Sequence, residues 1–146
     1  MKLLAILACS AAFLAASCSD SSDSTAADTE ATEALDATGV RVVAADEAEA
    51  VRANPPDDLV ILDVRTTEEF DSGHLEGAVM LDFYDPDFAA QIAELDPDVP
   101  YLLYCRSGNR SGQTAEIMEQ LGFADVADVD GGILAWADAG LPIVTE

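Results

Sequence analysis

An apolar run passes directly into a polar, glycine-containing loop in the segment Tyr101-Leu102-Leu103-Tyr104-Cys105-Arg106-Ser107-Gly108-Asn109-Arg110-Ser111. The apolar part is short enough to be a buried strand, and residues 113–121 after the loop are predicted to form a helix. Backbone N–H groups at the start of a helix have no intrahelical partners, and the helix dipole adds partial positive charge there. A strand, a tight loop and a helix in this order therefore predict a site that binds an anion.

Cys105 stands at the edge of this predicted site, beside Arg106 and Arg110. A thiol in a positive field ionises more easily, and the thiolate is the nucleophilic form. The alternative is an inert cysteine buried in the core, which is a common fate of a free cysteine. Because sites in open α/β sheets form at the carboxyl ends of strands, the position of Cys105 favours a nucleophile.

Strands and helices are predicted to alternate from residue 39 to residue 146. The predicted strands cover 40–43, 59–64, 78–83, the run that begins at Tyr101, and 126–129; the predicted helices cover 46–53, 66–70, 86–95, 113–121 and 133–139. Thr66 or Thr67 is expected to cap the second helix. This alternation predicts one α/β domain with a mostly parallel sheet, and the absence of an internal repeat argues against a tandem pair.

Residues 1–17 resemble a bacterial export signal, because Lys2 precedes an apolar run that is too short to span a membrane. Ala15-Ala16-Ser17-Cys18 resembles a lipobox, the motif in which the cysteine is lipidated and becomes the new N-terminus. We therefore expect an extracytoplasmic protein, periplasmic or at the cell surface, that is attached to the membrane only through a lipid on Cys18. An ordinary secretory signal cleaved near Ser17 is the alternative.

Residues 18–38 are predicted to form a disordered acidic linker, since they are rich in Ser, Thr, Ala and Asp and contain one large apolar residue. A short helix over residues 30–37 is the alternative, although it would have nothing to pack on. Cys9 lies within the predicted signal and Cys18 would carry the lipid, so Cys105 would be the one free thiol of the mature protein. An intramolecular disulfide is then excluded.

The chain is strongly acidic. Six Lys and Arg residues stand against 29 Asp and Glu residues, which gives a formal net charge of −23. Nucleic-acid phosphates are bound by clustered Lys and Arg, so this charge argues against a nucleic-acid partner.

Cys105-Arg106-Ser107-Gly108-Asn109-Arg110 resembles the six-residue active-site loop of the rhodanese (sulfurtransferase) family. Further segments resemble that family's signatures and follow in the same order: Leu62-Asp63-Val64-Arg65, Glu69-Phe70, Gly73-His74-Leu75-Glu76-Gly77-Ala78, and Asp130-Gly131-Gly132 with Trp136. The resemblance covers residues 39–146. Leu81-Asp82-Phe83 departs from it, because the family usually has a short segment ending in proline after the third strand.

The resemblance implies a three-layer α/β fold with a central, mostly parallel five-stranded sheet. It also implies a sulfurtransferase in which Cys105 is the catalytic nucleophile and Arg106, Ser107, Gly108, Asn109 and Arg110 bind the substrate. Sulfur would pass from a small anionic donor such as thiosulfate, through a persulfide on Cys105, to cyanide or a thiol. No metal or organic cofactor is implied.

Two other functions stay open. The first is an arsenate reductase or phosphatase activity on the same fold. Cysteine phosphatases of related fold have an arginine six positions after the cysteine, whereas Arg110 comes five positions after Cys105. The loop also lacks an aspartate that could protonate a leaving alkoxide. The other is a non-catalytic module that senses or binds sulfide, against which the intact cysteine and arginines count.

Four residues outside the loop need an interpretation. Asp63 is expected to hold the sheet edge to its neighbouring loop. Arg65 either lies beside the anion site or pairs with a carboxylate such as Glu69. His74 could form a dyad with Cys105, but the resemblance favours a structural role, and a lone histidine does not predict a metal site. Trp136, like Phe123, is expected in the core.

Overall fold

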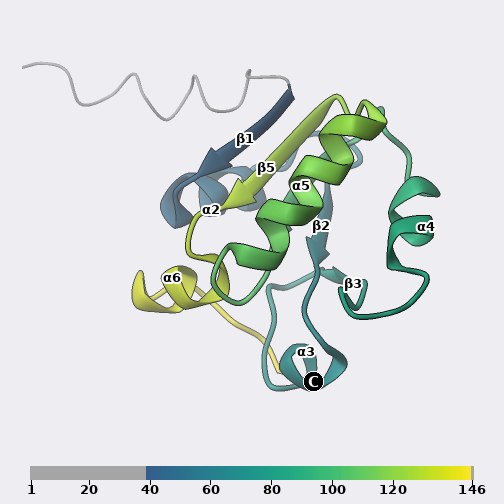
Figure 1. Cartoon of the computed structure of the whole chain (residues 1–146). Helices are drawn as coiled ribbons and strands as arrows, with labels where there is room; N and C mark the ends of the chain where they lie inside the picture. Colours follow the sequence, from purple (N-terminus) through teal and green to yellow (C-terminus); the bar gives the residue numbers. More distant parts are fainter. Residues whose placement is uncertain (1–38, 146) are drawn as a thin grey trace, which may run out of the picture.

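The computed structural model describes residues 39–145, and Figure 1 shows how their strands and helices are arranged. The predicted export signal, Cys18 and the predicted linker lie outside the described residues. Within residues 39–145, no helix is long and apolar enough to cross a membrane.

A five-stranded sheet forms the centre of the domain, with strand order β1-β5-β4-β2-β3 and every neighbouring pair parallel. The strands are β1 (Gly39–Val43), β2 (Val60–Asp63), β3 (Val79–Met80), β4 (Pro100–Tyr104) and β5 (Asp125–Val129). The predicted α/β class and the five-stranded parallel sheet are therefore confirmed. β4 lies between β2 and β5, so the residues that follow it emerge near the middle of one sheet edge.

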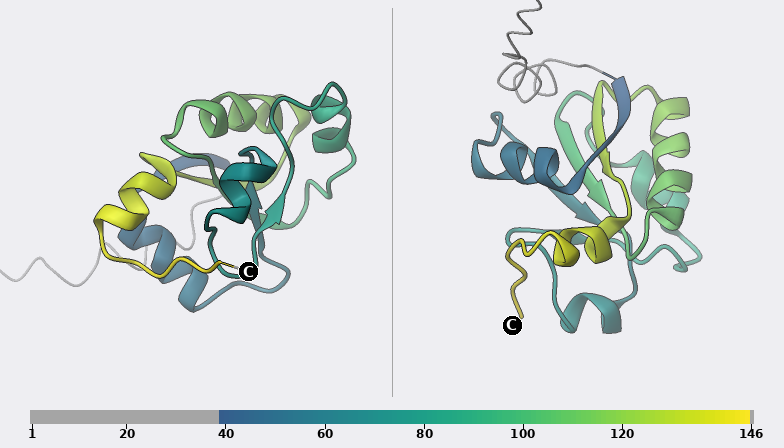
Figure 2. Two further views of the ribbon diagram at one scale, coloured as in Figure 1. Left: turned by 90° about the horizontal axis from the view of Figure 1, so that it is seen from below. Right: turned by 90° about the vertical axis from the view of Figure 1, so that its left-hand side faces the viewer.

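Helices cover both faces of the sheet, as the side views in Figure 2 show. They are α2 (Ala45–Ala53), α3 (Thr67–Asp71), α4 (Phe88–Ala93), α5 (Asn109–Leu121) and α6 (Gly132–Asp138). One apolar cluster joins the sheet to α2 and α6 and includes Trp136, which is fully buried. The other joins it to α4 and α5 and includes Phe123 and Cys105. Trp136 and Phe123 are core residues, as expected.

Three predicted elements differ from the observed ones by more than one residue at an end, and one of them is the helix predicted over 86–95, which spans only Phe88–Ala93. The strand predicted over 78–83 is only Val79–Met80, because the chain turns at Asp82, whose side chain accepts a hydrogen bond from the backbone N–H of Tyr84. The helix predicted from residue 113 begins four residues earlier, at Asn109. Gly108 precedes it with φ of +87°, a left-handed conformation that turns the chain directly from the strand end into the helix.

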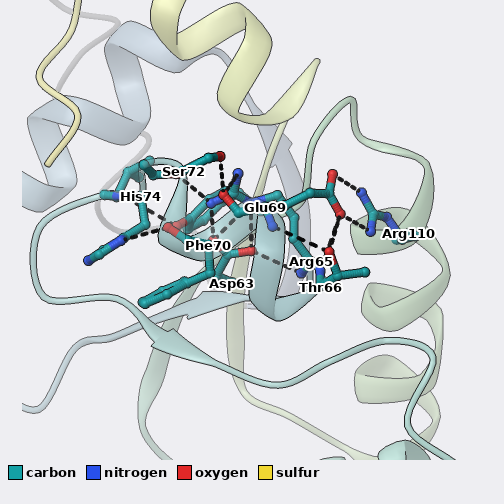
Figure 3. Close-up of polar contacts among 11 residues, drawn as sticks. Asp63, Arg65, Thr66, Glu69, Phe70, Ser72, His74 and Arg110 are labelled. Carbon is teal, nitrogen blue, oxygen red and sulfur yellow. Dashed lines mark hydrogen bonds and ion pairs between the residues drawn. The ribbon is translucent and has the colours of Figure 1, made fainter. Parts of the chain in front are cut away.

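A buried ion pair closes the end of β2. The Arg65 guanidinium donates to the Asp63 carboxylate at 2.6 to 2.9 Å, and the backbone N–H of Arg65 donates to the same carboxylate at 2.9 Å. Arg65 also donates to the backbone oxygens of Glu69 and Gly73. Asp63 thus ties the end of β2 to the following segment through Arg65, as predicted. Arg65 pairs with Asp63 and not with the Glu69 carboxylate (Figure 3).

Asp63→Asn should lower the free energy of unfolding by about 3 kcal/mol, because it leaves the buried Arg65 guanidinium without a carboxylate partner. Urea denaturation measures the change. The control is Glu49→Gln, which removes the partner of Arg52 on α2 near the surface. That variant should lose about 0.5 kcal/mol. Equal losses in the two variants would contradict a special role for the buried pair.

Candidate active site

Cys105 follows β4 directly and is 1% exposed. Its Sγ accepts a hydrogen bond from the backbone N–H of Gly108 at 3.1 Å. The left-handed conformation of Gly108 bends the loop back over the sulfur. A Cβ atom at Gly108 would also lie 3.4 Å from the backbone nitrogen of Gly131, so a side chain has little room there.

Several polar groups change the pKa of the Cys105 thiol. Burial raises its pKa, but the Ser111 hydroxyl and the backbone N–H groups of Ser111, Ser107 and Arg110 outweigh burial. The pKa of Cys105 therefore lies below its ordinary value. Two of these N–H groups belong to the first turn of α5, where no intrahelical partner competes for them. The strand, loop and helix thus follow in the predicted order, with the sulfur of Cys105 among their backbone N–H groups; that they bind an anion stays a prediction.

Backbone N–H groups at the start of α6 bind two carbonyl oxygens of the loop. The backbone N–H of Ile133 donates to the carbonyl oxygen of Cys105 at 2.9 Å, and that of Leu134 donates to the carbonyl oxygen of Arg106 at 3.2 Å. A Cβ atom at Gly132 would lie 2.4 Å from the Cys105 oxygen, so glycine is required for this close approach.

The arginines of the site differ in their contacts. Arg110 donates two hydrogen bonds, at 2.7 and 2.8 Å, to the carboxylate of Glu69, which faces it from α3 (Figure 3). Arg65 is buried against Asp63. Arg106 is exposed, and it is the one arginine among residues 39–145 without an ion pair. Of the three arginines that the sequence placed near the site, Arg106 is therefore the cation that is open to an anion.

A hollow of about 250 Å³ lies beside the loop. Arg106 and Glu69 contribute charged groups to its lining, while Ile133, Leu134 and Ile143 contribute apolar ones. α6 therefore both supports the loop and forms a wall of this hollow.

The remaining loop residues, Ser107 and Asn109, differ in their contacts. Ser107 is exposed, and its backbone N–H acts on the Cys105 sulfur. Asn109 is the first residue of α5, and its side-chain oxygen accepts a hydrogen bond from Gln113 at 3.1 Å. Substrate binding by the side chains of Ser107 and Asn109 stays a prediction.

His74 has structural contacts. Its ring stacks on Phe70 with centroids 3.8 Å apart, its Nδ1 lies 3.1 Å from the Phe70 carbonyl oxygen, and its backbone pairs with Val144. These contacts fit the predicted structural role. Among residues 39–145, no group of three or more His, Cys, Asp or Glu side chains is placed to hold a metal ion.

Sequence reasoning missed three residues of the site. Glu69, which binds Arg110, was considered only within a family signature segment and as a possible partner for Arg65. Ser111 and Asp128 are buried behind Cys105. The available signal for Asp128 was a carboxylate between two apolar residues of a strand, and for Ser111 it was a small polar residue directly after the loop.

Comparisons with known proteins agree with this geometry. Residues 44–139 match the family described as "Rhodanese-like domain". A sulfurtransferase of Allochromatium vinosum is 35% identical over 98 residues, which are 67% of this chain and 90% of that protein. The thiosulfate sulfurtransferase GlpE of Pseudomonas savastanoi pv. phaseolicola is 34% identical over 68% of this chain and 89% of its own length. The crystal structure of a rhodanese-related protein from Thermoplasma volcanium has a TM-score of 0.62 and 29% identity, and covers 73% of this chain and 99% of that chain.

Glu69→Gln should lower the free energy of unfolding at neutral pH by about 1 kcal/mol, since the pair with Arg110 is partly exposed. Arg110 is the main group that holds the pKa of Glu69 at about 2, below its usual 4.5. Because the folded-state pKa is lowered, this stabilisation is complete above pH 4.5 and is lost as the pH falls toward about 2. The wild-type and Glu69→Gln unfolding curves should therefore converge over that range.

The control for this experiment is Glu68→Gln, which changes an exposed neighbour in the same first turn of α3. The difference in the free energy of unfolding between Glu68→Gln and the wild type should not shrink in this way as the pH falls. A pH-independent difference for Glu69→Gln would show that the ion pair with Arg110 contributes nothing to stability.

Proposed function

This chain belongs to the family of rhodanese-like domains, and from that premise we propose that it is a sulfurtransferase that moves sulfane sulfur through a persulfide on Cys105. The donor is a small anion such as thiosulfate, and the acceptor is cyanide or a thiol. One observation carries the proposal: the sulfur of Cys105 is surrounded by backbone N–H groups that lower its pKa, and the next residue of the loop, Arg106, is exposed and in no ion pair within residues 39–145.

The first half of the reaction loads the sulfur. The Cys105 thiolate attacks the outer sulfur of thiosulfate, a new S–S bond forms, and the old S–S bond breaks. Sulfite leaves with the electron pair of that bond. The loop N–H groups and Arg106 stabilise the charge on the bound anion, as preorganised donors do in other active sites.

The second half of the reaction discharges the sulfur. The acceptor attacks the outer sulfur of the persulfide, and Cys105 leaves as a thiolate. The hollow beside Arg106 offers the acceptor a place to approach, with apolar side chains from α6 on one side. No proton donor for a leaving alkoxide is needed, because both leaving groups are stable anions.

Thiosulfate should add one sulfur atom to the protein, and cyanide should remove it, because Cys105 is the free thiol of the described residues. Intact mass spectrometry of the reduced protein checks both steps. Cys105→Ser should fold normally and take up no sulfur. Thiosulfate that leaves the mass of folded wild-type protein unchanged would refute sulfur transfer, and turnover of an aryl phosphate in its place would support a phosphatase.

Arg106→Gln should raise the KM for thiosulfate about tenfold, since one charge-assisted contact with the anion is lost. Steady-state kinetics with cyanide as acceptor measure the change. Arg52→Gln is the matched control: it removes an equal charge from α2, where Arg52 is paired with Glu49. If the two variants gave equal KM values, Arg106 would have no local role.

The predicted location remains part of the proposal. We expect Cys18 to carry a lipid that attaches the domain to a bacterial membrane from the extracytoplasmic side. Wild-type protein produced in a bacterial host should partition into detergent, and Cys18→Ser should abolish this behaviour. Unlipidated wild-type protein in the soluble extracytoplasmic fraction would instead indicate an ordinary cleaved signal.

A further inference from the structure

Two buried polar side chains lie behind Cys105 with atoms that lack a hydrogen bond of good geometry. Ser111 is 0% exposed and Asp128 is 4% exposed. The unpartnered atoms are Oγ of Ser111 and Oδ1 of Asp128. Burying a carboxylate without a partner is costly, so its presence beside a reactive thiol calls for an explanation.

The fold brings these residues and Cys105 together. β5 directs Asp128 toward the first turn of α5: a Cβ atom at Gly112 would lie 3.9 Å from its Oδ2. Ser111 precedes Gly112 in the same turn, and its hydroxyl lowers the pKa of both the Cys105 thiol and the Asp128 carboxyl group. Ser111 is thus the link between the nucleophile and a buried acid.

Within residues 39–145, no positively charged side chain pairs with Asp128. Its neighbours in the sheet are Val42 on β1 and Leu103 on β4. None of the arginines in residues 39–145 forms an ion pair with it; the nearest on α5, Arg110, is bound to Glu69. Burial, together with the negative charge of Asp130, raises the pKa of Asp128 to about 6, against the opposing effect of Ser111.

We propose that Ser111 and Asp128 are positioning residues that form a proton-dependent switch behind Cys105. The Ser111 hydroxyl has one proton to donate. When Asp128 is ionised, the carboxylate competes with the sulfur for that proton. When Asp128 is protonated, its own O–H donates to Ser111 Oγ, and the Ser111 proton is free for Cys105 Sγ.

This inference rests on the proposed sulfur transfer, in which Cys105 is first the nucleophile and then the leaving group. The switch affects both roles. A protonated Asp128 favours the thiolate, both as it forms and as it departs from the persulfide. An ionised Asp128 withdraws the Ser111 hydrogen bond and adds a negative charge nearby. The two groups therefore titrate as a coupled pair, and each ionisation opposes the other.

The test is the pH profile of Cys105 alkylation by iodoacetamide, a neutral reagent that reports the thiolate. The wild-type rate should rise with pH in two coupled steps, more gradually than a single titration. Asp128→Asn cannot ionise, and its amide can donate to Ser111 Oγ. Its profile should be a single step displaced to lower pH. Alkylation should match the wild type well below about pH 6, where Asp128 is protonated, and should be about tenfold faster near neutral pH, where wild-type Asp128 is ionised, the effect of one hydrogen bond to a charged sulfur.

Three controls separate the switch from a structural role. Ser111→Ala should slow alkylation on the acid side, and adding Asp128→Asn to it should have a much smaller effect than Asp128→Asn has in the wild type, because only the direct effect of the Asp128 charge remains. Asp130→Asn removes the same charge from an exposed position and should move the profile far less. Asp128→Asn should unfold at a temperature no lower than the wild type at neutral pH, since it removes a buried charge.

An Asp128→Asn profile identical to that of the wild type would overturn the proposal. So would additive effects of the Asp128 and Ser111 substitutions. Because alkylation needs no sulfur donor, these results do not depend on whether thiosulfate loads the protein. A failure of the switch and a failure of the sulfurtransferase function would therefore be told apart.

Discussion

The contact between Gly132 and the peptide groups of Cys105 and Arg106 is the constraint on which the site depends. The start of α6 binds the carbonyl oxygens of these two residues, at a distance that only glycine permits. In a planar trans peptide the N–H points away from the C=O. Holding the carbonyls on α6 therefore directs the N–H of Ser107 away from α6, toward the Cys105 sulfur on which it acts. Gly108 completes the arrangement by turning the chain into α5.

The described domain has few positively charged side chains, and most of them are in ion pairs. Residues 39–145 contain five arginines and no lysine, and Arg41, Arg52, Arg65 and Arg110 are in ion pairs. Two of these pairs shape the site, because Asp63 with Arg65 closes the end of β2, and Glu69 with Arg110 joins α3 to α5. Under the proposed function, Arg106 is the local attraction for an anionic donor in a chain whose net charge is −23. The contrast between this one cation and the acidic surface would direct the anion to the site.

The sequence predicted the order of the elements and the position of Cys105 at the end of a strand, because both depend on local patterns. Apolar runs followed by turn residues mark the strands, and Cys105 with its loop follows one of them. The start of α5 was misplaced, since polar residues 109–112 resemble a loop unless the left-handed turn at Gly108 is known. The partners of the arginines were also not predictable: Glu69 lies 41 residues before Arg110, and their contact depends on how α3 packs. Asp128 was assigned only to the short strand predicted over 126–129, since only the sheet register and the packing of α5 show what it faces.

Sulfur transfer needs one thiol to act as both nucleophile and leaving group, and these roles make opposite demands. A strongly stabilised thiolate leaves easily but attacks weakly, because nucleophilicity falls with the thiol pKa. Here burial raises the pKa of Cys105, and neutral N–H groups and the Ser111 hydroxyl lower it. Arg110, although it is in the loop, is bound to Glu69 and cannot pair fully with the sulfur. In the proposed reaction, stabilisation by dipoles of moderate strength, with the loop arginine Arg110 held by Glu69, would suit Cys105 to both halves of the transfer.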